Sequence, residues 1–480
     1  MVIANVLEKI VGILWGTPLL VALVSIGLFL TIKSGFWQFR YFKHAWKYTY
    51  SILKNNKSDD KDQSGILSSY QAIATALGSA VGIGNIAGVA SAIALGGPGA
   101  LFWMWVCALI GMVTKMAEIT LALHYRTNDP NKEAYGGPTY YIEKGFKEKG
   151  YFGWKPLAFL FGIGIMSDYF LGMSAYTISE AVSVTFNINQ IVVGIGFAIL
   201  LYAVILGGIQ RLGRVLSLVV PFMALFYILA GLLIILKDIS SLPGTFALIF
   251  KSAFVPMAPV GGFAGASISL ALRTGIARGV YSNEAGWGTA AMIHSTAKVD
   301  HPVKQGLLGI VEVFIDTMIV CSITGLVIIN TGVWSSGLSS SALALKAFEK
   351  GLGTWGSIIL TLGIFLLGWT SVTAKYTNYE IILRHVFGLN KKVRTTVIKI
   401  MRYGVPLPGL FLTIYAVKNG IPSSIVWLFA DMVTGIPTFV NIIALFLLSG
   451  KFFELLKNYT QKYILKTSDN KENTKLFYNE

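Results

Sequence analysis

The sequence predicts an all-α polytopic membrane protein with about eleven transmembrane helices, and three observations support this fold class. Of the 480 residues, 54% are hydrophobic and only 13% are charged, and the mean hydropathy is +0.65. Several apolar runs are long enough to cross a bilayer, which takes about 20 residues in a helix. The lysines and arginines gather in the loops between these runs and give the chain a formal net charge of +16.

The basic loops predict the orientation of the chain in the membrane. They lie at residues 33–61, 126–155, 384–402 and 451–466, and with eleven spans all four fall on the same side. Loops rich in lysine and arginine are typically cytoplasmic. We therefore expect a cell-membrane protein with its N-terminus outside and its C-terminus in the cytoplasm. Charges in such loops do not indicate nucleic-acid binding.

The predicted spans divide into one that stands apart and ten that follow. We expect an N-terminal span with a cytoplasmic amphipathic linker over 1–65, a first repeat over 66–239, a second repeat over 240–449 and a cytoplasmic tail over 450–480. The first and the sixth of the ten are rich in glycine and interrupted, which is typical of inverted-repeat transporters. The eleven spans lie near residues 10–32, 66–95, 101–124, 157–186, 191–207, 215–236, 261–297, 307–330, 355–384, 397–417 and 421–449.

The stretch that organises the chain is QAIATALGSAVGIGNIAGVASAIALGG, residues 71–97. Its centre, residues 78–85, is a poor continuous helix, because each glycine costs about 1 kcal/mol relative to alanine. We therefore predict two half-helices joined by an unwound turn. Such a turn offers backbone amides to an anion and carbonyls to a small cation. The alternative is that the small residues only allow helices to pack closely.

Three segments resemble a known transporter family. AVGIGN (80–85) resembles the broken first core helix of the leucine transporter (LeuT) fold, whereas GGPGALFWMW (96–105) and RGVYSNEAGWG (278–288) are similar to signature segments of the alanine/glycine:cation symporter family. The resemblance implies a LeuT-like 5+5 inverted repeat with two discontinuous helices plus one extra N-terminal helix. It also implies import of small neutral amino acids by alternating access, with a sodium ion for coupling and no further cofactor.

A sodium site is implied where the broken helix meets the segment LGWTS at residues 367–371. The resemblance assigns to it the backbone carbonyls of Gly78 and Val81, with the Leu367 carbonyl and the hydroxyls of Thr370 and Ser371. Positions i, i+3 and i+4 share one face of a helix, so the last three groups can converge. In the alternative interpretation, both hydroxyls bond to carbonyls of their own helix.

A zwitterionic substrate needs a partner for each of its charged ends. We expect the carboxylate at the amides of residues 82–84, where a half-helix begins, and the ammonium at carbonyls of residues 267–271. The unwinding point of the second interrupted segment stays open between 261–265 and 275–279. The candidate substrate-binding residues are Thr75, Ser79, Ala80, Gly82, Ile83, Gly84, Asn85, Asp168, Phe170, Ser267, Ser269 and Trp369. The two aromatic residues would wall the side-chain pocket.

Ionisable side chains inside the spans are costly in lipid and indicate function. Asp168 either faces the substrate ammonium or lines the permeation path. Glu312 and Asp316 lie at i and i+4 and would repel each other, so either one is protonated or a cation such as Arg273 or Arg278 lies between them. Structural ion pairing is the alternative role. The remaining carboxylates inside spans are Glu118, Glu380 and Asp431.

Other function classes fit the sequence less well. The five histidines show no metal-ligand spacing, and there is no phosphate-binding glycine loop, so we do not expect an enzyme. A channel would need rings of polar pore residues, which the sequence does not contain. A proton-coupled symporter of the same fold, driven through Asp168 or Glu312, remains open. The only cysteines, Cys107 and Cys321, lie inside apolar segments, so we expect buried free thiols.

Overall fold

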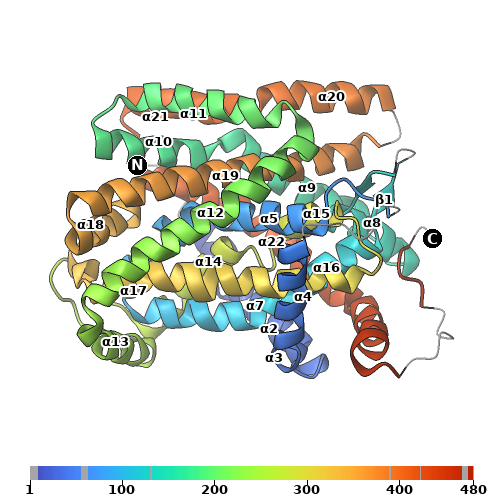
Figure 1. The fold of residues 1–480 in the computed structure, drawn as a ribbon, viewed down its shortest axis with the longest axis horizontal. Coiled ribbons are helices and arrows are strands. Elements are labelled where there is room, and N and C mark those ends of the chain that lie inside the picture. Colours follow the sequence, from blue (N-terminus) through green and yellow to red (C-terminus); the bar gives the residue numbers. More distant parts are fainter. Residues whose placement is uncertain are drawn as a thin grey trace.

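A computed structural model describes residues 9–55, 63–129, 132–388, 391–421, 423–467 and 474–478. Most of its helices run lengthwise through the molecule (Figure 1). Among the described residues, eight helices are long and apolar enough to cross a membrane, or nine if the bent pair Ser69–Ala80 and Ile83–Gly96 counts as one span. The other two predicted spans are a shorter apolar helix, Gln190–Ile205, and an interrupted pair between residues 268 and 295.

The N-terminal part begins with a helical span over Lys9–Lys33 and continues as helices that are interrupted by a hairpin of two short strands, each of two residues. Its elements are α2 (Thr17–Lys33), α3 (Trp37–Arg40), α4 (Phe42–Asn55), α5 (Ser69–Ala80), η1 (Ile83–Asn85), α6 (Ala87–Gly96), α7 (Gly99–His124), β1 (Thr127–Asn128), β2 (Ala134–Tyr135), α8 (Pro138–Glu148), α9 (Trp154–Leu171), α10 (Met173–Phe186), α11 (Gln190–Ile205) and α12 (Gly208–Lys237). The antiparallel pair β1–β2 is the only sheet among the described residues.

The C-terminal part is mostly helical, with a non-helical segment over 255–267 that contains two isolated β-bridges. Its elements are η2 (Ile239–Ser241), α13 (Leu242–Phe254), α14 (Ile268–Asn283), α15 (Thr289–Ser295), α16 (Pro302–Val313), η3 (Phe314–Cys321), α17 (Ser322–Asn330), η4 (Val333–Ser335), α18 (Ser340–Leu352), α19 (Thr354–Val386), α20 (Lys391–Gly404), α21 (Pro406–Asn419), α22 (Ser423–Tyr459) and η5 (Thr460–Leu465). Two of these, η3 and η5, are π-helical, and π-helical turns occur frequently at functional sites.

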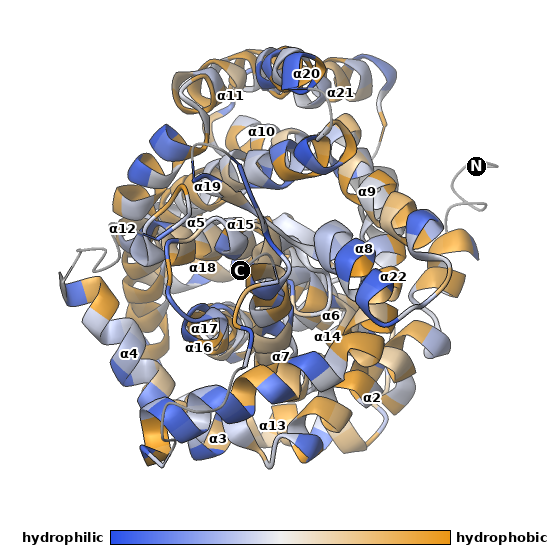
Figure 2. Cartoon of the chain, turned by 90° about the vertical axis from the view of Figure 1, so that its right-hand side faces the viewer, coloured by the Kyte–Doolittle hydropathy of each residue, from blue (hydrophilic) through white to orange (hydrophobic). Residues whose placement is uncertain are grey.

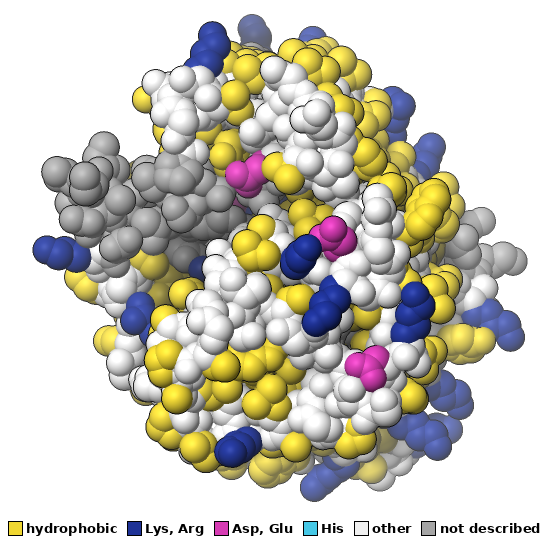
Figure 3. Space-filling model, turned by 90° about the vertical axis from the view of Figure 1, so that its left-hand side faces the viewer, with side chains coloured by type: hydrophobic (Ala, Val, Ile, Leu, Met, Phe, Trp, Pro, Cys, Tyr) yellow, Lys and Arg dark blue, Asp and Glu magenta, His cyan; other side chains and the backbone are white. Residues whose placement is uncertain are grey.

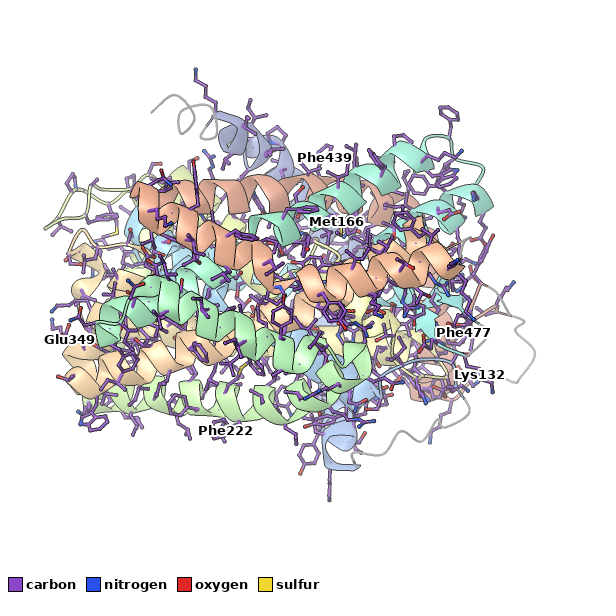
Figure 4. The ribbon with its side chains drawn as sticks, turned by 90° about the horizontal axis from the view of Figure 1, so that it is seen from above. Lys132, Met166, Phe222, Glu349, Phe439 and Phe477 are labelled. Carbon is purple, nitrogen blue, oxygen red and sulfur yellow. The ribbon has the colours of Figure 1, made fainter. Side chains whose placement is uncertain are left out.

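The two ends of the helix bundle differ in polarity. The helix α8 and the hairpin strand β1 lie at one end, α13 and α18 lie at the other, and α4 crosses the bundle on the side nearer to the first end (Figure 1). Hydrophilic residues concentrate on α4, α8 and the loops of the first end (Figure 2), whereas few acidic side chains show at the opposite end (Figure 3). Figure 4 places Lys132 and Phe477 at the first end and Glu349 at the other. The basic loop at 126–155 therefore lies at the first end, and the basic linker at 33–61 lies toward the same end.

The core is centred on α7, which packs against α14, α15 and α16. Glycines of α14 permit the closest approach. A Cβ atom on Gly275 would lie 2.4 Å from the carbonyl oxygen of Ala100, and one on Gly279 would lie 3.1 Å from the Cβ of Cys107. Cys107 and Cys321 are buried free thiols, as predicted.

The two helix interruptions are both present, but the second lies elsewhere than predicted. The first lies between α5 and α6, where the axes bend by 51°, within the predicted residues 78–85. The second lies between α14 and α15, at residues 284–288, so both candidate positions, 261–265 and 275–279, were wrong. Glycines at 275 and 279 serve close packing inside a continuous helix. The chain instead unwinds where Glu284, Gly286 and Gly288 adopt positive φ angles of 56°, 98° and 85°.

Candidate functional site

The first interruption is a compact turn in which glycine is required. Helix α5 ends at Ala80, Val81 is extended, and the short helix η1 begins at Ile83. A Cβ atom on Gly82 would lie 3.1 Å from the hydroxyl oxygen of Ser371, and one on Gly84 would lie 3.0 Å from the ring of Tyr281. The turn is therefore enclosed by α19 on one side and by α14 on the other.

Helix α19 contacts the turn through a hydroxyl that sequence reasoning had singled out. Ser371 Oγ donates to the backbone oxygen of Ser79 over 2.9 Å, so this hydroxyl crosses between helices. Thr370 Oγ1 instead lies 3.0 Å from the carbonyl oxygen of Leu366 and 2.9 Å from that of Leu367, within its own helix. The alternative interpretation thus describes Thr370 and not Ser371. All these groups lie in the protein interior beside Gly78, whose Cβ would be 3.7 Å from that of Thr370.

Asn85 joins the turn to the opposite wall of the site. Its Oδ1 accepts from the Gly82 amide over 2.8 Å, and its Nδ2 donates to Asp316 Oδ1 over 2.6 Å. Thr324 Oγ1 donates to the Asn85 carbonyl over 2.8 Å. Both the Asn85 side chain and the Gly82 amide are therefore occupied, which corrects their predicted role as direct substrate donors. Of the three amides expected to bind the substrate carboxylate, those of Ile83 and Gly84, near the start of η1, are left for this role.

Glu284 connects the two interrupted helices. Its Oε1 accepts from Ser79 Oγ over 3.1 Å, and its Oε2 accepts from Thr289 Oγ1 over 2.7 Å. The residue is 1% exposed and lies at the end of α14. A carboxylate at this position has unused acceptor capacity and faces the turn of the first broken helix. Glu284 and Asp316 are therefore both acidic groups beside the first turn, Glu284 through Ser79 and Asp316 through Asn85.

The second turn is held by polar side chains from α7 and α22. Lys115 Nζ donates to the carbonyl of Asn283 over 2.6 Å, and Glu118 Oε1 accepts from the Gly286 amide over 3.0 Å. Asn441 Nδ2 donates to the Gly286 carbonyl over 2.9 Å. Backbone groups freed by unwinding in a membrane need such internal partners, and the three side chains supply them.

Glu312 and Asp316 each have partners from other helices. A cation of α7 pairs with Glu312. Lys115 Nζ lies 2.7 Å from Glu312 Oε1, and His294 Nε2 lies 3.0 Å from Glu312 Oε2. Asp316 instead accepts from Asn85 and from Ser282 Oγ, the latter over 2.8 Å. The cation that pairs with Glu312 is therefore Lys115, and not one of the two arginines named as examples, Arg273 and Arg278. Each carboxylate has its own set of partners.

Asp168 is paired and Phe170 lies outside the site. Asp168 Oδ2 lies 3.0 Å from Lys375 Nζ and 3.0 Å from the hydroxyl of Tyr379, so its partner is α19 in this conformation. Phe170 is 67% exposed and packs on Tyr169, with ring centroids 4.7 Å apart. Its predicted role as a pocket wall is therefore wrong, because it projects from the opposite face of α9.

Ser267 and Ser269 also lie away from the turns. Both are exposed at the start of α14, and Ser267 Oγ accepts from the Leu270 amide over 3.1 Å as a helix cap. In this conformation the hydroxyls expected near the ammonium therefore lie at the exposed start of α14. Thr75 is fully buried on α5, and its Oγ1 has no hydrogen-bond partner among the described residues. The indole nitrogen of Trp369 on α19 is likewise buried and unpartnered there.

The remaining predicted residues lie at the junction of α5 and α19. Ala80, Val81 and Leu367 are buried. Ile83 is 6% exposed and approaches α19, where a Cβ on Gly368 would lie 3.4 Å from its Cγ2. At this junction the Ser371 hydroxyl meets the Ser79 carbonyl, and the Thr370 hydroxyl meets the Leu367 carbonyl.

Sequence reasoning missed three charged residues. Glu284, Lys115 and Lys375 all lie within predicted spans, and the cost of ionisable groups in lipid would have singled them out. Glu284 also lies within the quoted segment RGVYSNEAGWG. The side chain of Asp431 is outside the part of the chain that the structure describes.

The chain is similar to known transporters in sequence and in fold. A model of the sodium:alanine symporter family matches residues 1–475. A sodium/alanine symporter, AgcS, of Methanococcus maripaludis is 38% identical over 452 residues, covering 93% of this chain and 95% of the relative. An amino-acid carrier protein, AlsT, of Bacillus subtilis is 36% identical over 447 residues, covering 92% and 89%. The structure of MhsT in complex with L-phenylalanine matches with a TM-score of 0.55 at 14% identity, covering 79% of this chain and 89% of that one. The fold is therefore LeuT-like.

Proposed function

Because the chain belongs to the sodium:alanine symporter family, we propose that it couples sodium entry to the import of small neutral amino acids such as alanine and glycine. The observation that carries the proposal is the junction at Ser79. Its hydroxyl donates to Glu284 and its carbonyl accepts from Ser371. One residue of the first broken helix thereby links the second broken helix to α19.

The proposed position of the substrate follows from the polar groups at the two turns that can still bind its carboxylate and its ammonium. The amides of Ile83 and Gly84 begin η1, and the first N–H groups of a helix lack partners within it. They suit the substrate carboxylate, which the helix dipole also favours. Glu284 suits the ammonium better than Asp316, since Glu284 accepts from two hydroxyls, those of Ser79 and Thr289, whereas Asp316 already accepts from Asn85, Ser282 and Thr317 among the described residues. Pairing with an ammonium offsets the cost of a buried carboxylate.

The sodium ion is proposed at the junction of α5 and α19. The Ser79 carbonyl and the hydroxyl oxygens of Thr370 and Ser371 are hard, neutral ligands. Each hydroxyl donates its hydrogen to a carbonyl and keeps lone pairs for a cation. Carbonyls of Gly78 and Val81 complete the proposed set. An ion there would fix the turn against α19, so sodium and amino acid would each raise the affinity for the other by the same factor.

We also propose that the end bearing α8 and β1 faces the cytoplasm, because basic loops are retained there. This places the N-terminus outside and the C-terminal tail inside. Proton coupling is the competing mechanism, and its candidates are the buried carboxylate Glu284 and the partly buried carboxylate Asp168. Both mechanisms use the same fold and differ only in the ion that completes the site.

Binding of radiolabelled alanine to purified protein separates the two mechanisms. Sodium is replaced by choline at constant pH, and pH is varied separately at constant sodium. We expect alanine binding to require sodium and to be lost in a Thr370→Ala/Ser371→Ala variant. Thr361→Ala, which changes a buried threonine on the same helix, is the matched control and should bind normally. Binding that ignores sodium and follows pH would contradict sodium coupling, and no alanine binding at all would contradict the substrate.

A further inference from the structure

A large crevice lies apart from the proposed transport site. It has a volume of about 690 Å³ and opens between α8, α9 and the last turns of α19, with Arg394 of α20 at its mouth. Along α9 its lining runs from Trp154 to Met166. Twelve residues of helix span about 18 Å at 1.5 Å per residue. The stretch of α9 that lines the crevice is therefore about as long as one leaflet of hydrocarbon is thick, which is half of about 30 Å. Met166, at its deep end, is labelled in Figure 4.

The deep part of the crevice is apolar and open to the surroundings of the bundle. Phe159 and Ile163 of α9 are 66% and 46% exposed, and nearer the mouth Val386, the last residue of α19, is 62% exposed. A soluble protein would rarely expose such a strip, but in a membrane span it faces lipid tails. A single amino acid has too little apolar surface to cover it.

The mouth of the crevice carries unpaired positive charge. Arg384 is neutralised by Glu380 at 2.7 Å, and Glu143 pairs with Lys147 at 2.7 Å. Lys155 and Arg394, in contrast, form no ion pair with any carboxylate of the described residues. Both cations line the crevice, where the Lys155 ammonium lies 5.7 Å from the Trp154 ring centroid, and the carboxylates Asp129 and Glu143 line it with them.

We propose that this crevice binds an anionic phospholipid, with its phosphate at Lys155 and Arg394 and an acyl chain along Phe159 and Ile163. Basic pockets between membrane helices are suited to anionic headgroups. The occupant bears on transport, because the crevice separates α9 from α19, the two helices joined by the Asp168–Lys375 ion pair. A lipid held there would stabilise the spacing of these helices in the conformation described. The proposal does not depend on which amino acid or ion is transported.

Native mass spectrometry of the delipidated protein in detergent tests the site. We titrate palmitoyl-oleoyl phosphatidylglycerol against palmitoyl-oleoyl phosphatidylcholine and count bound lipids. A Lys155→Ala/Arg394→Ala variant should bind phosphatidylglycerol at least about tenfold more weakly, since each cation contributes about 1 kcal/mol. The matched control is Lys251→Ala/Lys418→Ala, which removes two exposed lysines elsewhere and should bind like the wild type.

A second pair of variants tests the acyl-chain part independently of charge. A Cβ on Gly162 would lie 3.6 Å from Ile382 Cγ2, so Gly162→Ala fits, whereas the larger side chain of Gly162→Leu would fill the crevice. We expect Gly162→Leu to weaken phosphatidylglycerol binding and Gly162→Ala to preserve it. Three results would overturn the proposal: equal binding of both lipids by the wild type, unchanged binding by the Lys155→Ala/Arg394→Ala variant, or full displacement of the lipid by inorganic phosphate. The last would indicate a site for free phosphate only.

Discussion

Replacing Glu284 by glutamine tests whether this carboxylate binds the substrate ammonium. Glutamine keeps an oxygen that can accept from Ser79 Oγ, now 3.1 Å away, or from Thr289 Oγ1, now 2.7 Å away, but it removes the negative charge. A hydrogen bond to a charged group contributes about 1.5–3 kcal/mol. Because each 1.4 kcal/mol is tenfold, alanine affinity should fall about 10- to 150-fold.

The assay is equilibrium binding of radiolabelled alanine at saturating sodium, with thermal unfolding measured in parallel. Glu118→Gln is the matched control, because Glu118 is also fully buried and bonds to an unwound turn, through the Gly286 amide, without facing the first turn. We expect this control to lower the unfolding temperature and to leave alanine affinity near the wild-type value. The reasoning fails if Glu284→Gln binds alanine as the wild type does, since Glu284 would then only join the two helices.

Three further variants test the packing of the bundle. Lys115→Met leaves Glu312 with only His294 as a charged partner, so the free energy of unfolding should fall by about 3–5 kcal/mol. A Lys115→Met/Glu312→Gln double variant should recover part of this loss in a thermal-unfolding assay. A single variant as stable as the wild type would contradict the buried pair. Gly275→Ala places a Cβ 2.4 Å from a carbonyl oxygen of α7 and should cost about 1–3 kcal/mol, which an unchanged unfolding temperature would refute. Phe477 is buried, and the Arg126 guanidinium lies 4.6 Å from its ring centroid, so Phe477→Ala should speed proteolysis of the C-terminal tail; an unchanged cleavage rate would mean that this contact does not hold the tail.

The first helix break could be predicted because its cause is local. Three glycines within eight residues penalise a continuous helix, and the break lies where they occur, between Ala80 and Ala87. The second break could not be located by the same rule. Gly275 and Gly279 allow α14 to pack closely against α7, and this contact is visible only in the packed structure. The residue that ends α14 is Glu284, in the left-handed conformation with a φ of 56°, which is unusual for glutamate.

The partners of the buried charges depend on contacts between distant parts of the chain. Glu312 meets Lys115 from a helix almost 200 positions earlier, and Asp168 meets Lys375 from one more than 200 positions later. No spacing rule within a helix predicts such pairs. In contrast, the relation between Thr370 and Ser371 follows from helical geometry alone. The sequence pattern did not specify whether each hydroxyl bonds to a carbonyl of its own helix, as Thr370 does, or to a carbonyl of α5, as Ser371 does. That choice depends on how closely α5 approaches α19.

Uptake of radiolabelled alanine into proteoliposomes tests the central claim most directly. The purified protein is reconstituted in vesicles of defined lipid, and an inward sodium gradient or an inward proton gradient is imposed in separate experiments. The account predicts accumulation of alanine above its external concentration with the sodium gradient alone, and none with the proton gradient alone. Accumulation driven by the proton gradient in the absence of sodium would contradict it.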